Sequence, residues 1–145
     1  MEPYRHVVQY YETDRMGIVH HSNYIRWMEE ARVDFLRRIG WPWDELEERG
    51  IFSPVLTLDC RYQAGTGFGD TVTIRVTVRE VKGARLVIHY EMENQAGKPV
   101  FQGTSEHCFV SRDGRPMRLK RECPEFYALL AELAAATKGS ADGEK

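Results

Sequence analysis

The sequence has few cysteines and no long run of hydrophobic residues. Its three cysteines, Cys60, Cys108 and Cys123, are odd in number and widely spaced, so they suggest neither a disulfide framework nor a zinc site. This pattern favours a reducing compartment, and we expect the protein in the cytoplasm. No stretch approaches the length of a membrane span, and residues 1–6 lack the pattern of a signal peptide. We therefore expect neither a membrane span nor export.

Neither sign of charge is in large excess. The formal net charge is -2 at pH 7, which argues against nucleic acid as a partner, since nucleic-acid-binding domains usually carry a basic surface. Hydrophobic residues make up 42% and charged residues 29% of the 145 positions, as in ordinary globular proteins. A chain of this length has no room for a second domain. We predict one domain over residues 1–138 and a flexible tail over 139–145, where the residues are small or charged.

Three helices are predicted. Apolar residues recur at steps of three and four from about residue 23 to residue 38, which indicates one long helix. A short helix is expected over residues 42–49 and a C-terminal helix from Pro124, because both segments open on proline. The long helix also carries apolar residues outside its main stripe, which suggests that a second subunit covers them. These residues are Ile25, Val33, Leu36 and Ile39.

Alternating apolar and polar residues, or runs rich in aromatic and β-branched residues, predict five strands. They cover residues 4–11, 56–62, 72–79, 86–93 and 100–112. The last four are joined by short turns and are therefore expected to be antiparallel. The resulting fold class is α+β, with the long helix covering one face of a five-stranded antiparallel sheet.

The segment ETDRMGIVHHSNYIRWMEEAR, residues 12–32, resembles the signature of the hotdog-fold thioesterases. It is most similar to the 4-hydroxybenzoyl-CoA thioesterase family and the related bacterial short-chain acyl-CoA thioesterases. The matching positions are Asp14, Gly17, Ile18, Val19, His21, Asn23, Tyr24, Glu29 and Arg32. The resemblance extends over roughly residues 4–124. It implies a hotdog fold, in which the sheet wraps the long helix, and a homodimer with active sites at the subunit boundary. Many members of the family pair such dimers into tetramers.

The resemblance also implies a reaction, the hydrolysis of an acyl-CoA thioester. Asp14 is the expected catalytic carboxylate, which either attacks the acyl carbon or deprotonates a water molecule. The oxyanion is expected to bind free amides at the start of the long helix, first of all the amide of His21. The His21 side chain orients Asp14, binds water, protonates the leaving thiolate or only packs there. Gly17, Val19 and Tyr24 are expected at the substrate site, although for Tyr24 we favour core filling over lining the pocket, and the family allows both roles.

Coenzyme A carries several phosphate charges, so cations are expected near the mouth of the pocket. Arg118, Lys120 and Arg121 are the candidates, and a solvated basic surface is the alternative. No histidine or cysteine spacing indicates a metal site. No cofactor is expected either, because CoA is part of the substrate.

Several alternatives stay open at this point. Glu29 is either a catalytic carboxylate, as in another hotdog subgroup, or an ion-pair partner of Arg26 or Arg32, and we favour the ion pair. A hydratase or dehydratase acting on acyl thioesters requires another arrangement of His and Asp or Glu, which we do not find. A non-catalytic protein that binds acyl-CoA or an acyl carrier has the same fold, but the presence of both Asp14 and His21 argues against it.

Overall fold

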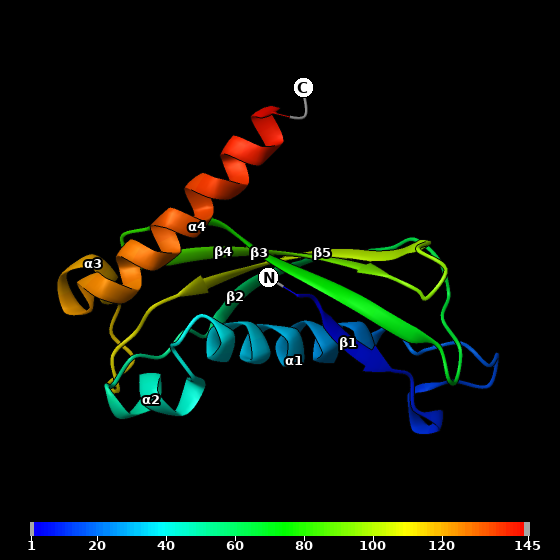
Figure 1. The fold of residues 1–145 in the computed structure, drawn as a ribbon. Helices are drawn as coiled ribbons and strands as arrows, with labels where there is room; N and C mark the ends of the chain where they lie inside the picture. Colours follow the sequence, from blue (N-terminus) through cyan, green and yellow to red (C-terminus); the bar gives the residue numbers. More distant parts are fainter. Residues whose placement is uncertain (1, 144–145) are drawn as a thin grey trace.

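The computed structural model describes residues 2–143 and shows an antiparallel sheet with helices on both of its faces (Figure 1). The strands lie in the order β1-β3-β4-β5-β2, and every neighbouring pair is antiparallel. Their bounds are β1 Tyr4–Val7, β2 Val55–Tyr62, β3 Thr71–Lys82, β4 Arg85–Glu93 and β5 Pro99–Cys108. The predicted α+β fold with a five-stranded antiparallel sheet is confirmed.

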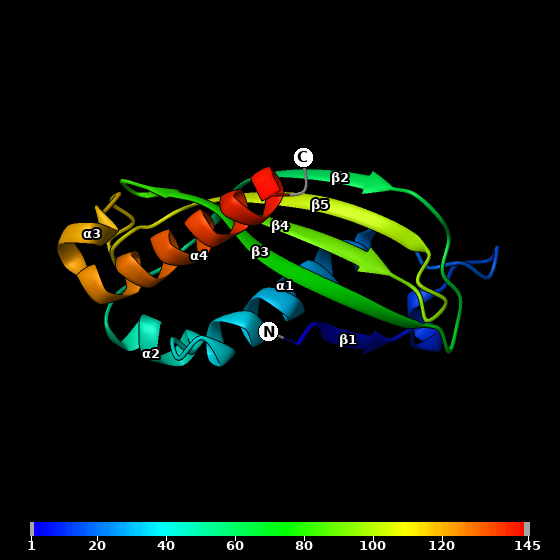
Figure 2. The same ribbon diagram turned by 45° about the horizontal axis from the view of Figure 1, so that its top comes forward.

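The long helix α1, Ser22–Arg38, lies along one face of the sheet, and the C-terminal helix α4, Pro124–Gly143, crosses the opposite face (Figures 1 and 2). The remaining helices are short: η1 Tyr10–Glu12, α2 Trp43–Glu48 and α3 Leu119–Glu122. None of the helices within residues 2–143 is both long enough and apolar enough to span a membrane.

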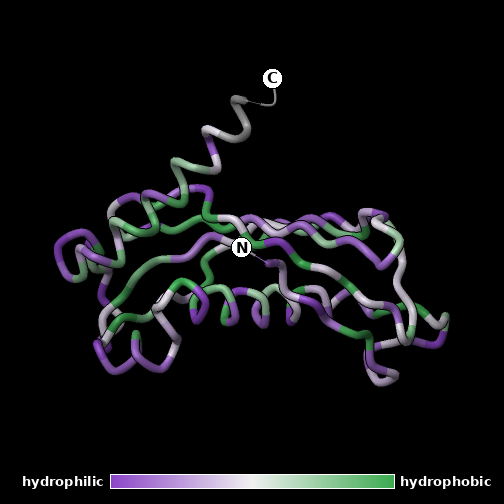
Figure 3. The backbone as a smooth tube through the Cα atoms, in the orientation of Figure 1, coloured by the Kyte–Doolittle hydropathy of each residue, from purple (hydrophilic) through white to green (hydrophobic). Residues whose placement is uncertain are grey.

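Helix α1 packs through the stripe that its periodicity predicts. Trp27 is 0% exposed, and Met28 and Ala31 are each 1% exposed. Hydrophobic and hydrophilic residues alternate along this helix in Figure 3. Gly103 of β5 permits the close approach, because a Cβ atom there would lie 3.0 Å from Cε of Met28 and 2.8 Å from the ring of Phe101. A larger residue at this position would push the helix away from the sheet.

Strand β2 differs from its prediction. Its alternation predicts one covered face, but Leu56, Leu58 and Tyr62 are 61%, 41% and 47% exposed. The reason is its position, because β2 is the edge strand at the opposite end of the sheet from β1 and β3, which α1 approaches more closely. On α1, the apolar residues Ile25 and Val33 outside the main stripe are also exposed, at 36% and 40%.

Several element boundaries also differ from the predictions. The first strand ends at Val7 instead of residue 11, because the chain then turns into η1. The fifth strand ends at Cys108 instead of residue 112, and α3 was not predicted. Leu36, predicted to lie outside the main stripe of α1, is buried.

Helix α4 continues to Gly143, beyond the predicted start of a tail at residue 139. Residues 144–145 of that tail lie outside the described residues. The single-domain boundary stays a prediction.

Candidate functional site

A tight loop joins η1 to the start of α1. Its two arms pair antiparallel through a bridge between Thr13 and Val19, and the Asp14 N–H donates to the Ile18 carbonyl at 2.8 Å. Gly17 closes the turn by donating its N–H to the Asp14 carbonyl at 3.0 Å. The φ of Gly17 is 79°, a conformation that other residues rarely adopt, so glycine is required at this turn. The loop therefore leads the chain directly back to the first turn of α1.

The residues predicted to carry the chemistry meet at one open pocket of ≈ 320 Å³. Asp14 and His21 both line it, together with Val19 and Tyr24. The other lining residues are Ile18, His20, Tyr62, Gln63, Ala64 and Gly65. Gly17 does not line the pocket and contributes through the turn alone. The structure thus brings together four of the predicted site residues.

The Asp14 side chain is exposed and only partly engaged. One carboxylate oxygen, Oδ1, accepts a hydrogen bond from the Met16 N–H at 2.8 Å. The other oxygen, Oδ2, has no hydrogen bond or ion pair with any of residues 2–143. Asp14 therefore stabilises its own loop as turn aspartates do, and still presents one free oxygen at the pocket.

His21 lies immediately before α1, and its backbone N–H donates to no acceptor among residues 2–143. The Tyr62 hydroxyl donates to the His21 carbonyl at 3.3 Å, and the rings of these two residues are 6.2 Å apart in an edge-to-face arrangement. A free N–H at the start of a 17-residue helix carries the positive end of the helix dipole. The arrangement can therefore bind a developing negative charge in the pocket.

Tyr24 forms the inner wall of the pocket. It is 3% exposed, its ring stacks on Phe101 at a centroid distance of 5.1 Å, and its hydroxyl is hydrogen-bonded to Thr66 Oγ1 at 2.8 Å. Burial raises the pKa of the Tyr24 hydroxyl above its ordinary value. Tyr24 thus fills the core, which the sequence predicts as its main role, and it also lines the pocket.

Glu12 anchors the loop, a role that the sequence pattern did not predict. Its side chain is buried, with 4% exposure. Oε1 accepts hydrogen bonds from the Gln9 N–H and from His6 Nε2, both at 2.8 Å, and Oε2 accepts from Trp27 Nε1 at 2.7 Å. Burial by itself raises the pKa of Glu12, but the hydrogen bonds from Gln9, His6 and Trp27 outweigh burial and lower it. The only signal in the sequence was its place two residues before Asp14.

The predicted phosphate-binding cations lie elsewhere in the chain. Arg118, Lys120 and Arg121 belong to α3 or to the residue before it, and the N–H of Leu119 donates to the Gly83 carbonyl in the β3–β4 turn at 3.3 Å. Figure 1 shows α3 at the opposite end of the fold from the loop before α1. Within one chain, the structure does not bring these cations to the Asp14 pocket.

Glu29 does not form the ion pair that helical spacing predicts. Within residues 2–143 it pairs with neither Arg26 nor Arg32, and it does not line the Asp14 pocket. Arg32 is not available to Glu29 because it turns into the core, where it is 7% exposed and its Nη1 lies 3.5 Å from the Tyr90 hydroxyl. The predicted ion pair is therefore wrong for the single chain.

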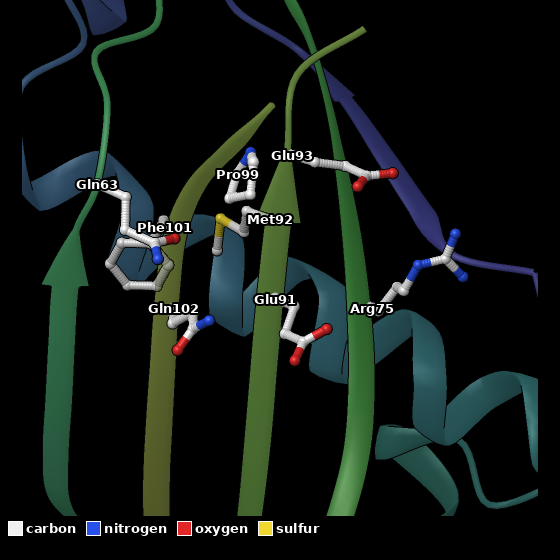
Figure 4. A pocket seen from close by; sticks show the side chains of 8 residues that line it. All are labelled: Gln63, Arg75, Glu91, Met92, Glu93, Pro99, Phe101 and Gln102. Carbon is white, nitrogen blue, oxygen red and sulfur yellow. The ribbon is translucent and has the colours of Figure 1, made fainter. Parts of the chain in front are cut away.

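A second pocket opens on the other face of the sheet. Its lining includes the charged side chains Arg75, Glu91 and Glu93, and α1 lies behind the sheet in the view of Figure 4. It shares only Gln63 with the pocket of Asp14.

Among residues 2–143, no group of three His, Cys, Asp or Glu side chains is placed to hold a metal ion.

Several known proteins are similar to this chain in sequence and in fold. Residues 8–136 match a family described as the thioesterase-like superfamily. The chain is 31% identical over 121 residues to the Bacillus subtilis protein named "Putative acyl-CoA thioesterase YneP". The aligned region covers 83% of this chain and 88% of that protein. The structure of a DHNA-CoA thioesterase from Staphylococcus aureus has a TM-score of 0.86 at 28% identity, covering 99% of this chain and 95% of the other. A gentisyl-coenzyme A thioesterase, BH1999, has a TM-score of 0.72 at 31% identity, covering 79% and 91%. The chain therefore belongs to the thioesterase-like superfamily and has its hotdog fold.

Proposed function

We propose that this protein hydrolyses the thioester of a small aliphatic or aromatic acyl-CoA to the free acid and CoA. The observation that carries the proposal is the convergence of two free groups on one pocket. Asp14 Oδ2 and the His21 N–H both lack partners among residues 2–143, and both residues line the same open space. Thioester hydrolysis needs this combination, a carboxylate at the acyl carbon and a donor for the oxyanion.

The reaction has two routes that share one geometry. The thioester carbonyl oxygen accepts a hydrogen bond from the His21 N–H, which polarises the carbonyl. In the first route Asp14 attacks the acyl carbon, the C–S bond breaks, CoA leaves as the thiolate, and water then hydrolyses the mixed anhydride. In the second route Asp14 takes a proton from a water molecule that attacks the same carbon. Both routes yield the acid and CoA, and the thiolate needs little acid assistance.

The remaining pocket residues have supporting roles. Val19 and Tyr24 form an apolar wall that accommodates the acyl group, and Gly17 sets the turn that holds Asp14 in place. The His21 side chain is exposed beside Asp14, where it is available to bind the attacking water. Both aliphatic and aromatic acyl groups are compatible with walls of this kind.

We further propose that the active unit is a homodimer that pairs into a tetramer. The outer edge of β2 has no strand partner among residues 2–143, and the exposed residues Leu56, Leu58 and Tyr62 lie on this strand. An apolar edge strand of this kind pairs readily with a second copy of itself. In such an assembly the cations Arg118, Lys120 and Arg121 of a neighbouring subunit are available for the CoA phosphates.

The test is a panel of short-chain, medium-chain and aromatic acyl-CoAs, assayed with a thiol reagent. We expect hydrolysis of at least one class, and a loss in kcat of about 100-fold or more in Asp14→Asn with little change in KM. Asp113→Asn, in an exposed turn, is the matched control and is expected to keep the parental rate.

Three outcomes contradict the proposal. Release of no thiol from any substrate indicates a binding protein. Water addition to crotonyl-CoA without release of thiol indicates a hydratase. Parental turnover in Asp14→Asn removes Asp14 from the mechanism.

A further inference from the structure

Glu12 holds the loop of Asp14 through its backbone as well as its side chain. Its carbonyl oxygen accepts two hydrogen bonds, from the His20 N–H and from Asn23 Nδ2, both at 2.9 Å. Asp14 follows Glu12 by two residues, and His21 follows His20 by one. The two segments that carry the proposed reacting groups are therefore joined at the Glu12 carbonyl. We call this arrangement of Glu12, His20 and Asn23 the clamp.

The Glu12 carboxylate fixes this clamp to the core. Trp27, which donates to Oε2, is 0% exposed and lies in the buried stripe of α1, while the Gln9 N–H and His6 Nε2 donate to Oε1 from β1 and the residues that follow it. Among residues 2–139, Glu12 is the only acidic side chain that is buried. Its donors come from both sides of the loop, so the carboxylate ties the entry of the loop to the helix that follows it.

We propose that Glu12 is a positioning residue for the thioesterase reaction, which sets the separation between the Asp14 carboxylate and the His21 N–H. The inference rests on the proposed function. A displacement of reacting groups by about 1 Å can lower a rate by about 100-fold, so loosening this clamp affects turnover even when the fold survives. Glu12 touches no substrate and acts only through Asp14 and His21.

Glutamine cannot replace Glu12 without conflict, although it has nearly the same shape. Both oxygens of Glu12 accept from N–H donors, Oε1 from Gln9 and Oε2 from Trp27. Either orientation of a glutamine amide places its NH₂ group against one of these donors. Trp27→Phe removes one donor, so the conflict is smaller when Trp27→Phe is combined with Glu12→Gln.

The experiment compares Glu12→Gln, Trp27→Phe and the double variant with the full-length parent, on its best acyl-CoA substrate. We expect Glu12→Gln to lower kcat about tenfold or more with KM within about threefold, at a temperature where circular dichroism shows it fully folded. The double variant is expected to lose less than the product of the two single losses. Glu30→Gln is the matched control, because Glu30 also contacts His6, at 3.2 Å, but its side chain is 45% exposed.

Hydrogen exchange of residues 13–22 supplies a readout that does not depend on activity. Faster exchange in this segment of Glu12→Gln supports the inference if α1 keeps its protection beyond the first turn. This result still shows that Glu12 holds Asp14 and His21 in place if no acyl-CoA is hydrolysed. Only the proposed function then fails. Parental kcat and exchange in folded Glu12→Gln overturn it, and so does a kcat loss that follows the unfolded fraction. If Glu12→Gln does not fold, Trp27→Phe decides: a lower kcat and faster exchange at 13–22 support the inference, and parental values overturn it.

Discussion

Two buried polar clusters lie along α1, and they differ in how well their charge is satisfied. At the start of the helix, both oxygens of the Glu12 carboxylate accept hydrogen bonds of 2.7–2.8 Å. In its second half, the Arg32 guanidinium has one long contact, 3.5 Å to the Tyr90 hydroxyl, and its Nε has no partner within residues 2–143. Buried charges are expensive unless they are hydrogen-bonded. The well-satisfied cluster is the one that adjoins the proposed active site.

The Arg32 cluster forms a chain of donors with a fixed direction. The Tyr90 hydroxyl is 2.8 Å from Ser105 Oγ, which is 2.7 Å from His107 Nε2, and His107 Nδ1 lies 2.9 Å from the Ser53 carbonyl. A carbonyl only accepts, so Nδ1 carries the proton and Nε2 of the neutral ring accepts from Ser105. Burial, together with the charge of Arg32, lowers the pKa of His107 to about 4. Protonation of His107 would reverse this chain and place two donors against each other.

The largest effect is expected at the satisfied cluster. Glu12→Ala leaves the Trp27 Nε1–H buried without an acceptor and removes the partner of the part-buried Gln9 N–H, and we expect it to lower the free energy of unfolding by about 3–5 kcal/mol. Urea denaturation followed by circular dichroism measures this change. A loss below about 1 kcal/mol would show that water replaces the carboxylate, and would remove the contrast between the two clusters.

The second effect is a dependence of stability on pH that arises from His107. The unfolded chain takes up a proton at this residue near the ordinary pKa of 6.5, and the folded chain only near pH 4. The free energy of unfolding therefore falls by up to roughly 3 kcal/mol from this residue as the pH is lowered from about 6.5 to 4. His107→Gln is expected to flatten this part of the profile. Val78→Ala, a core variant without a titratable change, keeps the parental slope, and equal slopes in His107→Gln and parent would contradict the prediction.

A smaller effect is expected when the unsatisfied charge is removed. Arg32→Met keeps much of the side-chain volume and removes the buried cation, so its stability is expected to lie within about 1 kcal/mol of the parent or above it. The same variant raises the pKa of His107, because burial and the Arg32 charge both oppose protonation and the charge is gone. Thermal and urea denaturation check the first expectation, and the slope between pH 6.5 and 4 checks the second. A loss above about 3 kcal/mol would mean that Arg32 is better satisfied than the comparison implies.

The smallest effect is expected at Glu30, which shares His6 with Glu12. Its Oε2 lies 3.2 Å from His6 Nδ1 and accepts a hydrogen bond from the Tyr4 hydroxyl at 3.1 Å, but the side chain is 45% exposed. Water replaces such contacts easily, so Glu30→Gln is expected to change the free energy of unfolding by about 0.5 kcal/mol or less. The difference between this variant and Glu12→Ala measures what burial contributes to a carboxylate beside the same histidine. Equal losses would show that contact with His6, and not burial, dominates.

The sequence predicted those parts of the fold that depend on local pattern. The periodicity of residues 23–38 and the alternation along the strands predicted the long helix and the sheet, and the motif predicted that Asp14 and His21 share a site. The end of β1 could not be predicted in this way. Residues 8–11 have strand-like composition, yet the Glu12 carboxylate caps the Gln9 N–H and stabilises the turn η1 instead. Glu12 takes that position because Trp27, fifteen residues further on, binds its other oxygen.

Hydrophobic periodicity and one motif by themselves determined the fold class, the family and the loop that carries Asp14, because each depends on residues close together in the chain. Tertiary structure decided which charged groups are buried and what they bind. Glutamate and arginine read alike as surface residues in a sequence, and Glu12 and Arg32 enter the core only because α1 packs on the sheet. The free energy of a buried charge depends on the donors and acceptors that distant segments bring to it, which local sequence does not encode.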